Sequence, residues 1–363
     1  MRTSSSTNIH QRTMSVYREM IRFLGEKGAE EGYRLPTQDI MVRNPKTCHA
    51  TLQVAMKWLV EDGVLSRTRK KGTFVLQPYP TAPKRAIWRT GIVMPSLANS
   101  AFLPLLTHFL HQHLSHQGAS ARAYFLSPKA APSAEVVVRR DSEFLGLAED
   151  IRDGLLDGIV TATRLRCPSL PVSSAGILYD QSGFGAVYDE EFFMRTAMDF
   201  LEANKAKRIF CLLPFDLAEI FPPMGEMMTQ LRAHLEAKGG TLEVTQNHAM
   251  PDSGRQLAQR LLERHPSLRP QGLVIQSETQ AQMFCNTLAA TSYHPLIVTQ
   301  TNKQIPTTFA LPVHKLAVDV EEVAACAVRL LIEKLRRPTQ KGATLRLKHY
   351  ASPPASQTLI SNL

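Results

Sequence analysis

Apolar residues near the start of the chain recur at helical spacing. The first stripe consists of Val16, Met20, Phe23 and Leu24. Their spacing predicts an amphipathic helix over 15–28 that ends in a glycine. The next segment, Arg34-Leu35-Pro36-Thr37, provides a turn and a helix N-cap. A short second helix should then stop at Asn44-Pro45, because proline disfavours α geometry in the residue before it.

A third helix is predicted after Thr47, which is a suitable N-cap. Its apolar face, at positions i, i+3, i+4 and i+7, consists of Leu52, Ala55, Met56 and Leu59. The helix should end at Asp62-Gly63. Two short β-prone runs within 64–75 then flank a basic, glycine-containing turn, which predicts a hairpin. Two helices joined by a tight turn form a helix-turn-helix, and the hairpin would be its wing.

Beyond residue 90, strand-like and helical segments alternate. Strands are expected at 91–94, 123–126, 157–160, 208–213, 242–244, 272–275 and 296–298. Helices are expected at 102–117, 144–155, 190–203, 224–238, 254–264 and 278–290. This alternation predicts parallel sheets with helices on both faces. Two sequential halves of about 100 residues each suggest two lobes rather than one continuous sheet.

Length and composition support the same division. A chain of 363 residues exceeds one ordinary core, and 44% hydrophobic with 20% charged residues is typical of folded protein. Prolines at 78, 80 and 83 with Lys84-Arg85 indicate a stiff, polar linker. We therefore predict a first domain over 1–78, a linker over 79–89, a large domain over 90–350 and a tail over 351–363.

The positive charge is concentrated in the first domain. Residues 1–89 hold 16 Lys and Arg against 7 Asp and Glu, whereas the remainder holds 26 against 25. Such a distribution is expected when one module neutralises phosphates and the other does not. A basic surface without a partner is the alternative on charge alone.

Other features restrict compartment and chemistry. No apolar run is long enough to span a membrane, and 1–11 lacks a secretory apolar region, so we expect a cytoplasmic, nucleoid-associated protein. The five cysteines are scattered without a CxxC pair, which favours neither disulfides nor a zinc site. The histidines at 108, 111, 113 and 116 lack a carboxylate or cysteine to complete a metal site, so we expect no metal.

The first domain resembles a known DNA-binding family. The segments that carry the resemblance are Arg34-Leu35-Pro36-Thr37, Ala55-Met56-Lys57-Trp58-Leu59, Asp62-Gly63-Val64-Leu65 and Lys71-Gly72-Thr73-Phe74-Val75. They are similar, without a gap, to the winged helix-turn-helix of the GntR family. The resemblance implies a recognition helix in the major groove, a wing at the adjacent minor groove, and a homodimer on a pseudo-palindromic double-stranded operator.

The resemblance also implies individual DNA contacts. The usual arginines of the second and third helices are replaced, because Asp39 stands at one position and Gln53 at another. Base readout would therefore fall to His49, Thr51 and Gln53, and glutamine pairs naturally with adenine. Phosphate contacts would come from Arg34, Lys46, Lys57 and the wing residues Arg67, Arg69, Lys70, Lys71 and Gly72.

The second domain resembles the periplasmic-binding-protein-like effector domain of LacI/GalR regulators. The matching segments are Thr90-Gly91-Ile92-Val93-Met94-Pro95, Leu156-Asp157-Gly158-Ile159-Val160, and Val318-Asp319-Val320 with the helix over 324–335. This implies a late crossover between lobes, a helix that packs at a dimer interface, and a small-molecule effector between the lobes. The implied effector contacts are Ser96, Asn99, Phe102, Ser277 and Glu278. The family's sugar-binding arginine is replaced by Met227.

Together these patterns predict an α+β winged helix-turn-helix followed by a two-lobed α/β domain, acting as an effector-controlled transcription regulator such as a repressor. No nucleotide-binding glycine motif or nucleophile with a base occurs, so we expect neither a cofactor nor an enzyme. An aminotransferase-like second domain would need a longer chain. A second domain that has lost its ligand and serves only for dimerisation remains the alternative.

Overall fold

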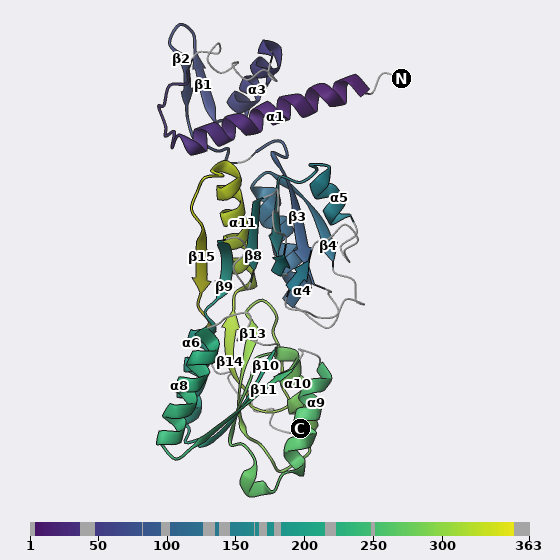
Figure 1. The fold of residues 1–363 in the computed structure, drawn as a ribbon, viewed down its shortest axis with the longest axis vertical. Helices are drawn as coiled ribbons and strands as arrows, with labels where there is room; N and C mark the ends of the chain where they lie inside the picture. Colours follow the sequence, from purple (N-terminus) through teal and green to yellow (C-terminus); the bar gives the residue numbers. More distant parts are fainter. Residues whose placement is uncertain are drawn as a thin grey trace, which may run out of the picture.

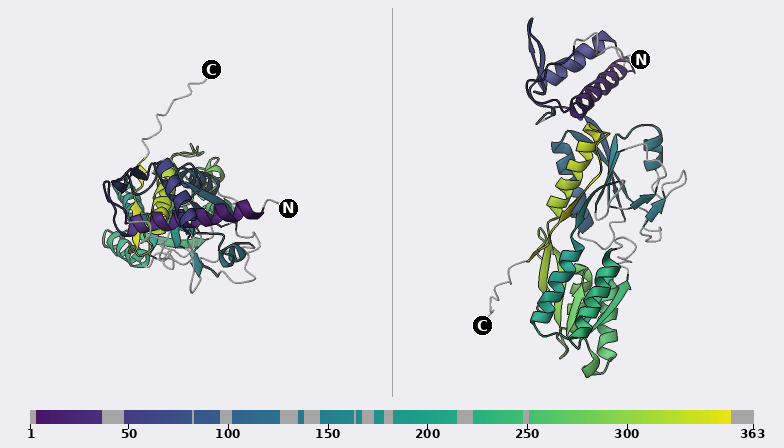
Figure 2. Two further views of the ribbon diagram at one scale, coloured as in Figure 1. Left: turned by 90° about the horizontal axis from the view of Figure 1, so that it is seen from above. Right: turned by 60° about the vertical axis from the view of Figure 1, so that its left-hand side comes forward.

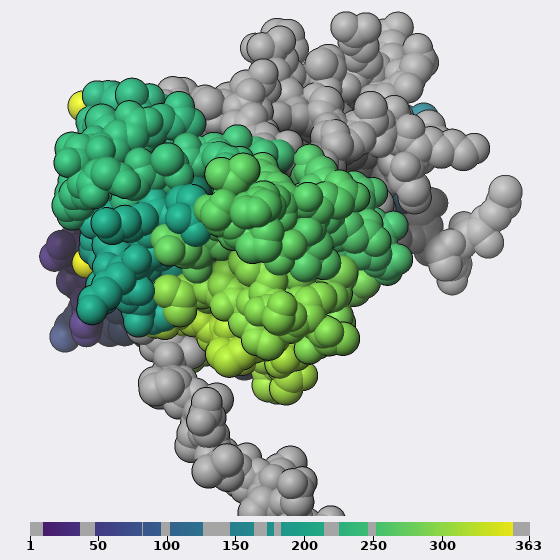
Figure 3. Space-filling view, turned by 90° about the horizontal axis from the view of Figure 1, so that it is seen from below, coloured from purple at the N-terminus to yellow at the C-terminus, as the bar shows by residue number. Residues whose placement is uncertain are grey.

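The computed structural model describes residues 4–36, 48–81, 83–95, 102–125, 135–137, 146–162, 164–166, 173–177, 183–214, 223–247 and 251–351. Three bodies are stacked along one long axis (Figure 1). We name them the head (4–36 and 48–77), lobe 1 and lobe 2. The side view in Figure 2 shows lobe 1 between the other two, and the view from below in Figure 3 is filled by lobe 2, with the head visible only at one edge.

The head contains a long helix, a second helix and a hairpin. Helix α1 is Ser4–Glu26, helix α3 is His49–Glu61, and strands β1 (Leu65–Thr68) and β2 (Gly72–Val75) pair antiparallel. Helix α1 begins well before the predicted helix. The prediction missed its first turns because residues 4–12 contain a single apolar residue, Ile9, and therefore no apolar stripe. The predicted second helix, over Ile40 and Met41, lies outside the described residues. The hairpin matches the prediction.

The head has its own apolar core. The inward face of α1 supplies Tyr17, Ile21 and Leu24, none of which is exposed. Helix α3 packs against them through the predicted stripe of Leu52, Ala55, Met56 and Leu59. At the end of α3, Gly63 has φ +72°, a left-handed conformation that glycine adopts without strain.

Lobe 1 is built on a parallel six-stranded sheet with the order β15-β9-β8-β6-β3-β4. The strands are β3 (Trp88–Met94), β4 (Ala119–Phe125), β6 (Gly158–Thr161), β8 (Ser173–Ile177), β9 (Phe184–Tyr188) and β15 (Ala343–Leu347). Helices α4 (Phe102–His116), α5 (Leu147–Arg152) and α11 (Val320–Arg336) belong to this lobe, and strands β5 (Glu135–Val137) and β7 (Arg164–Arg166) form a separate parallel pair.

Lobe 2 has a second six-stranded sheet with the order β11-β10-β12-β13-β14-β16. Its strands are β10 (Arg208–Pro214), β11 (Thr241–Asn247), β12 (Gly272–Ile275), β13 (Leu296–Asn302), β14 (His314–Val318) and the antiparallel edge strand β16 (Tyr350–Ala351). The helices are α6 (Glu190–Ala203), α8 (Pro223–Ala237), α9 (Pro251–Glu263) and α10 (Glu278–Leu288), with a 3-10 turn, η1, at Pro266–Leu268. Apolar clusters lie on both sheet faces.

The lobes are not sequential halves of the chain, which corrects that expectation. The chain leaves lobe 1 after β9, returns through α11 after β14, and passes from β15 to β16 at its end. Helix α11 and strand β15 therefore complete a lobe that began two hundred residues earlier. The crossover expected at Val318-Asp319-Val320 is present. Parallel strands allow this return because a crossover connection, not a hairpin, must join them.

Helix α11 is a core element of lobe 1. Nine of its residues are buried, including Val323, Ala327 and Leu331, and the helix packs on α4, β6, β8 and β9. Its apolar surface is therefore used largely within the chain, although the resemblance placed this helix at a dimer interface. Among the described residues, no helix combines the length and apolar character needed to cross a membrane.

Candidate nucleic-acid interface and interlobe site

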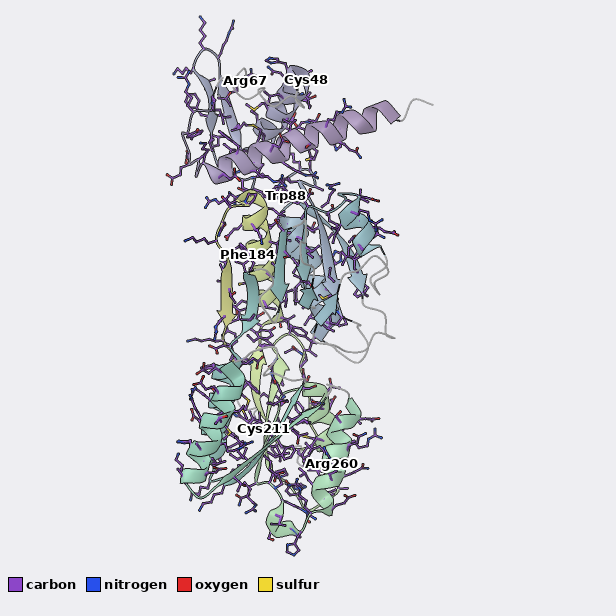
Figure 4. The ribbon with its side chains drawn as sticks, in the orientation of Figure 1. Cys48, Arg67, Trp88, Phe184, Cys211 and Arg260 are labelled. Carbon is purple, nitrogen blue, oxygen red and sulfur yellow. The ribbon has the colours of Figure 1, made fainter. Side chains whose placement is uncertain are left out.

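The predicted recognition helix presents a polar face away from α1. His49, Gln53 and Lys57 are exposed, while the apolar stripe faces the core. The helix begins after Cys48, whose Sγ lies 3.1 Å from Thr51 Oγ1. Gln53 Oε1 accepts a hydrogen bond of 3.3 Å from Arg67 Nη1, which links α3 to the wing. Figure 4 shows Cys48 and Arg67 at the head end of the molecule, away from lobe 2.

The wing carries its basic residues on a tight turn. Arg67, Arg69, Lys70 and Lys71 are all exposed. Lys70 has φ +67° and Gly72 has φ +119°, so the turn uses left-handed backbone at both positions. A Cβ on Gly72 would lie 3.0 Å from Arg34 Nε, which places the Arg34 side chain directly against the wing. The left-handed backbone favours glycine at this position, and a Cβ would also require the Arg34 side chain to shift.

The predicted DNA contacts form two neighbouring groups, on α3 and on the wing. The Arg67–Gln53 hydrogen bond links these two groups, and the bridge between Arg34 and Phe74 places Arg34 beside the wing. Lys57 lies 3.8 Å from Glu61 along the same helix, so part of its charge is locally compensated. Lys46, the remaining predicted phosphate contact, lies outside the described residues. The proximity of the two groups is compatible with the predicted interface.

The head and lobe 1 share an extensive contact that no pattern in the sequence predicts, and we call it the joint. In the joint, α1 packs on the last turn of α11. Arg22 Nε donates to Leu335 O at 3.3 Å, and Arg18 Nε donates to Ile87 O. Arg18 also lies 3.5 Å from Asp157 of lobe 1, and both side chains are mostly buried. Helices α1 and α11 approach closely because residue 25 is glycine, where a side chain would collide with the backbone of Arg336.

The segment after the wing is packed into the joint. Ile87 and Trp88 are fully buried, and Trp88 Nε1 donates to Tyr79 Oη at 3.1 Å. Arg85 makes hydrogen bonds of 3.0 and 3.1 Å to Asp62 at the end of α3. Tyr17 donates to the same carboxylate at 2.9 Å. The head is therefore held against lobe 1 by buried polar and aromatic contacts.

The interlobe region lies where the strands of lobe 2 end toward lobe 1. Of the predicted effector contacts, Phe102 begins α4 in lobe 1, and Ser277 and Glu278 begin α10 in lobe 2. Glu278 Oε2 accepts from Asn302 Nδ2 at 2.8 Å, and burial raises the pKa of Glu278. Ser96 and Asn99 lie outside the described residues, so the structure does not place them.

Two crossovers between the lobes begin helices capped by aspartate. Asp189 accepts from Phe192 N at 3.0 Å at the start of α6, and Asp319 accepts from Glu322 N at 3.1 Å at the start of α11. Lys303 and Gln304 also donate to Asp319, at 2.8 and 2.5 Å. These contacts fix the directions in which the helices leave the hinge.

A buried polar cluster beside the hinge was missed by sequence reasoning. Gln276 Nε2 donates to Glu190 Oε2 at 2.6 Å, joining the end of β12 to the start of α6. Burial and the neighbouring Asp189 raise the pKa of Glu190 to about 8. The Tyr188 ring makes an edge contact with Phe102, with centroids 6.3 Å apart. The only sequence signal was the position of these residues at element ends.

The structure also places Met227 and the histidines of α4, which the sequence singled out. Met227 is 5% exposed and packs in the apolar core of lobe 2, so the position of the missing arginine is filled by a core side chain. The histidines of α4 are mostly exposed, and the part of the chain that the structure describes contains no group of three or more potential metal ligands.

Comparison with known proteins concerns the fold. The sequence matches no protein-family model, and no curated protein matches it. Among similar solved structures is a LacI family transcriptional regulator from Bifidobacterium animalis subsp. lactis, 15% identical with a TM-score of 0.57, covering 74% of this chain and 97% of that one. The Cra transcriptional dual regulator from Pseudomonas putida, in complex with fructose 1-phosphate, is 17% identical with a TM-score of 0.56, covering 74% and 99%.

One similar structure extends over more of the chain. The transcriptional regulator CelR in complex with cellobiose is 15% identical with a TM-score of 0.56, and the match covers 93% of this chain and 98% of that one. Identities this low establish architecture rather than activity. The two-lobed domain of this chain has the periplasmic-binding-protein-like fold found in LacI-family transcription regulators.

Proposed function

We propose that this protein is a DNA-binding transcription regulator whose operator affinity is modulated by a small-molecule effector bound between the lobes. The head acts as a winged helix-turn-helix of the GntR type, and a homodimer reads a pseudo-palindromic operator. The protein is not an enzyme, and it works on the nucleoid in the cytoplasm. The observation that carries the proposal is the combination of a basic head with a two-lobed effector-type fold.

DNA binding is supported by the placement of the basic residues. The wing presents Arg67, Arg69, Lys70 and Lys71 on an exposed turn beside the polar face of α3. His49, Thr51 and Gln53 are proposed to contact base edges, with Arg34, Lys46, Lys57 and Gly72 contributing backbone contacts. The Arg67–Gln53 hydrogen bond orients a base-reading glutamine before DNA arrives.

Regulation is supported by the path from the hinge to the head. Helix α11 is capped by Asp319, beside the interlobe site, and ends at Arg336, against α1 of the head. A change in the angle between the lobes that moves the start of α11 would therefore act on an element that contacts the head directly. Phe102, Ser277 and Glu278, with Ser96 and Asn99, are the proposed effector contacts.

The first experiment is selection of bound duplexes from a random pool by the full-length protein at two salt concentrations. A short two-fold-symmetric site is the expected product. Sequence-blind, salt-sensitive recovery would show that the recognition helix does not read bases, and absence of binding would contradict the proposal. Effector binding is tested by thermal shift with small molecules, and protection by none of them would favour the dimerisation-only alternative.

The wing assignment has its own test. Replacing Lys70 and Lys71 with alanine should weaken binding to all duplexes and lower the slope of log Kobs against log salt by about 2. The matched control replaces Arg232 and Arg260, which are exposed on α8 and α9 of lobe 2, and removes the same charge far from the head. Equal effects of the two double variants would mean that only net charge matters.

A further inference from the structure

Within the part of the chain that the structure describes, several buried polar atoms at the hinge have unused hydrogen-bonding capacity. They include Glu278 Oε1 and the Nδ1 of His349, whose ring lies 5.8 Å from that of Tyr188, but the two that lie beside Glu190 belong to Tyr188 and Gln276. Tyr188 at the end of β9 is 6% exposed, and its hydroxyl has no hydrogen-bond partner among the described residues. Gln276, after β12, is 8% exposed, and its Oε1 also has no partner there. An unpaired buried polar atom costs about 1–3 kcal/mol. Native proteins rarely keep such groups without a bound partner or a functional use.

Both groups lie near the carboxyl group of Glu190. Gln276 Nε2 is bonded to Glu190, and Glu190 is the residue two places after Tyr188. The negative charges of Glu190, Asp319 and Glu322 add to the effect of burial in raising the pKa of Tyr188, so its hydroxyl lies on the acidic side of the hinge. The cluster therefore draws Tyr188 from lobe 1 and Glu190 and Gln276 from lobe 2.

The charge at this place selects among ligand classes. Lys303 lies 2.8 Å from Asp319 and neutralises its charge. Among the described residues, the groups that act on Glu190 are Gln276, which donates a hydrogen bond to it, and the negatively charged Asp189. Burial and Asp189 keep Glu190 protonated in the empty site, so the negative charge that a ligand meets there is that of Asp189. A phosphate or carboxylate ligand would be repelled by Asp189 and could not form an ion pair with Glu190. A protonated amine would be attracted to Asp189, and its proximity would favour the ionised form of Glu190, which then pairs with it.

The available oxygens also match an ammonium group. An ammonium carries three donors and no acceptor. Glu190, Gln276 Oε1 and Tyr188 Oη supply three oxygen atoms that accept hydrogen bonds, from the start of α6, the residue after β12 and the end of β9. The rings of Tyr188 and Phe102 lie edge to face beside them and provide aromatic surface for the carbon chain of the ligand.

We propose that the effector of this protein carries a protonated amine, which binds at the hinge to Glu190, Gln276 and Tyr188. The inference rests on the proposed effector site and names its ligand class. Because the three groups come from both lobes, an amine that bridges them stabilises one interlobe angle. Glu190 is largely protonated without ligand, so amine binding releases a proton to solvent as the ion pair forms.

The test uses the full-length protein and ligands of matched length. The probes are 1,5-diaminopentane, butylamine and agmatine, with 1,5-pentanediol, glucose and glucose 6-phosphate as neutral and anionic counterparts. We expect amines to raise the melting temperature and the diol of equal length not to do so. Calorimetric titration in two buffers of different ionisation enthalpy should show proton release on amine binding. Equal protection by the diol, or none by any amine, would overturn the proposal.

Variants separate the proposed contacts from general effects. Glu190→Gln should weaken amine binding about tenfold or more, because a hydrogen-bonded charge pair is lost. Tyr188→Phe should weaken it less. The control, Glu191→Gln, removes a neighbouring carboxylate that pairs with Arg195 at 3.0 Å and should bind amines like the unmodified protein. Unchanged amine affinity in Glu190→Gln would overturn the assignment.

Operator binding is measured on the same samples. If the operator is bound and glucose protects the protein while amines do not, the regulator function stands and the amine inference fails. If amines bind through Glu190 but no duplex is recovered, the amine site stands and the proposed regulator function fails.

Discussion

The joint between the head and lobe 1 depends on a glycine. Gly25 lies in the last turn of α1, and a Cβ at this position would be 2.6 Å from the carbonyl oxygen of Arg336, the last residue of α11. The obstacle is backbone, so no side-chain rotation can relieve the contact. In Gly25→Ala, α1 and α11 must therefore separate, by roughly 0.5 to 1 Å for an ordinary contact distance.

The expected free-energy change follows from two opposing terms. Overpacking of this kind costs about 1–3 kcal/mol, and alanine in place of glycine within a helix returns about 1 kcal/mol. The net loss in unfolding free energy should therefore be about 0–2 kcal/mol. The larger effect is local, because the separation also weakens the Arg22 hydrogen bond to Leu335 O and the Arg18–Asp157 ion pair.

The assay follows Trp88, which is fully buried beneath Arg22 in the joint. The chain contains two tryptophans, so a Trp58→Phe background isolates its fluorescence. Gly25→Ala should increase quenching of Trp88 by iodide and should reduce the effect of an effector on operator affinity. The matched control is Ser15→Ala, which improves helix propensity at an exposed position of the same helix.

Two results would refute this reasoning. If Gly25→Ala leaves Trp88 quenching and the urea midpoint the same as Ser15→Ala does, the head does not rest on α11 through residue 25. If the joint opens but effector still changes operator affinity by the same factor, the coupling does not pass through this contact.

Further predictions concern hydrogen bonding and pH. Tyr17→Phe removes a buried hydrogen bond to the Asp62 carboxylate and should lower the free energy of unfolding, measured in urea, by about 1.5–3 kcal/mol. Tyr350→Phe removes an exposed hydrogen bond to Glu322 and should lower it by less than about 1 kcal/mol. Equal losses would contradict the burial argument. The pKa of Glu190 rises from an ordinary 4.5 to about 8 on folding, so its protonated form favours the folded state, and that contribution is lost as pH rises between those values. The urea midpoint of Glu190→Gln, measured relative to that of the unmodified protein, should therefore rise from pH 5 to pH 9. Parallel pH profiles of the two proteins would be inconsistent with a raised pKa.

Local patterns in the sequence determined many of the elements. The expected helix over 190–203 and strand over 272–275 coincide with α6 and β12. The wing strands and the end of α3 at Asp62-Gly63 were also read from turn chemistry and apolar spacing. Strands β8, β9 and β15 were not predicted, because 173–177 and 184–188 are rich in small residues, and β15 acquires its place by pairing with β9, far away in the chain.

Only the tertiary structure decided which distant residues meet. Glu190 and Gln276 are 86 positions apart, and they bond because the start of α6 lies at the carboxyl end of β12. The return of α11 into lobe 1, and its contact with Gly25 of the head, likewise depend on sheet topology rather than on any local pattern. Periodicity reports which face of an element is buried, but the partner of that face is chosen by the packing of the whole chain.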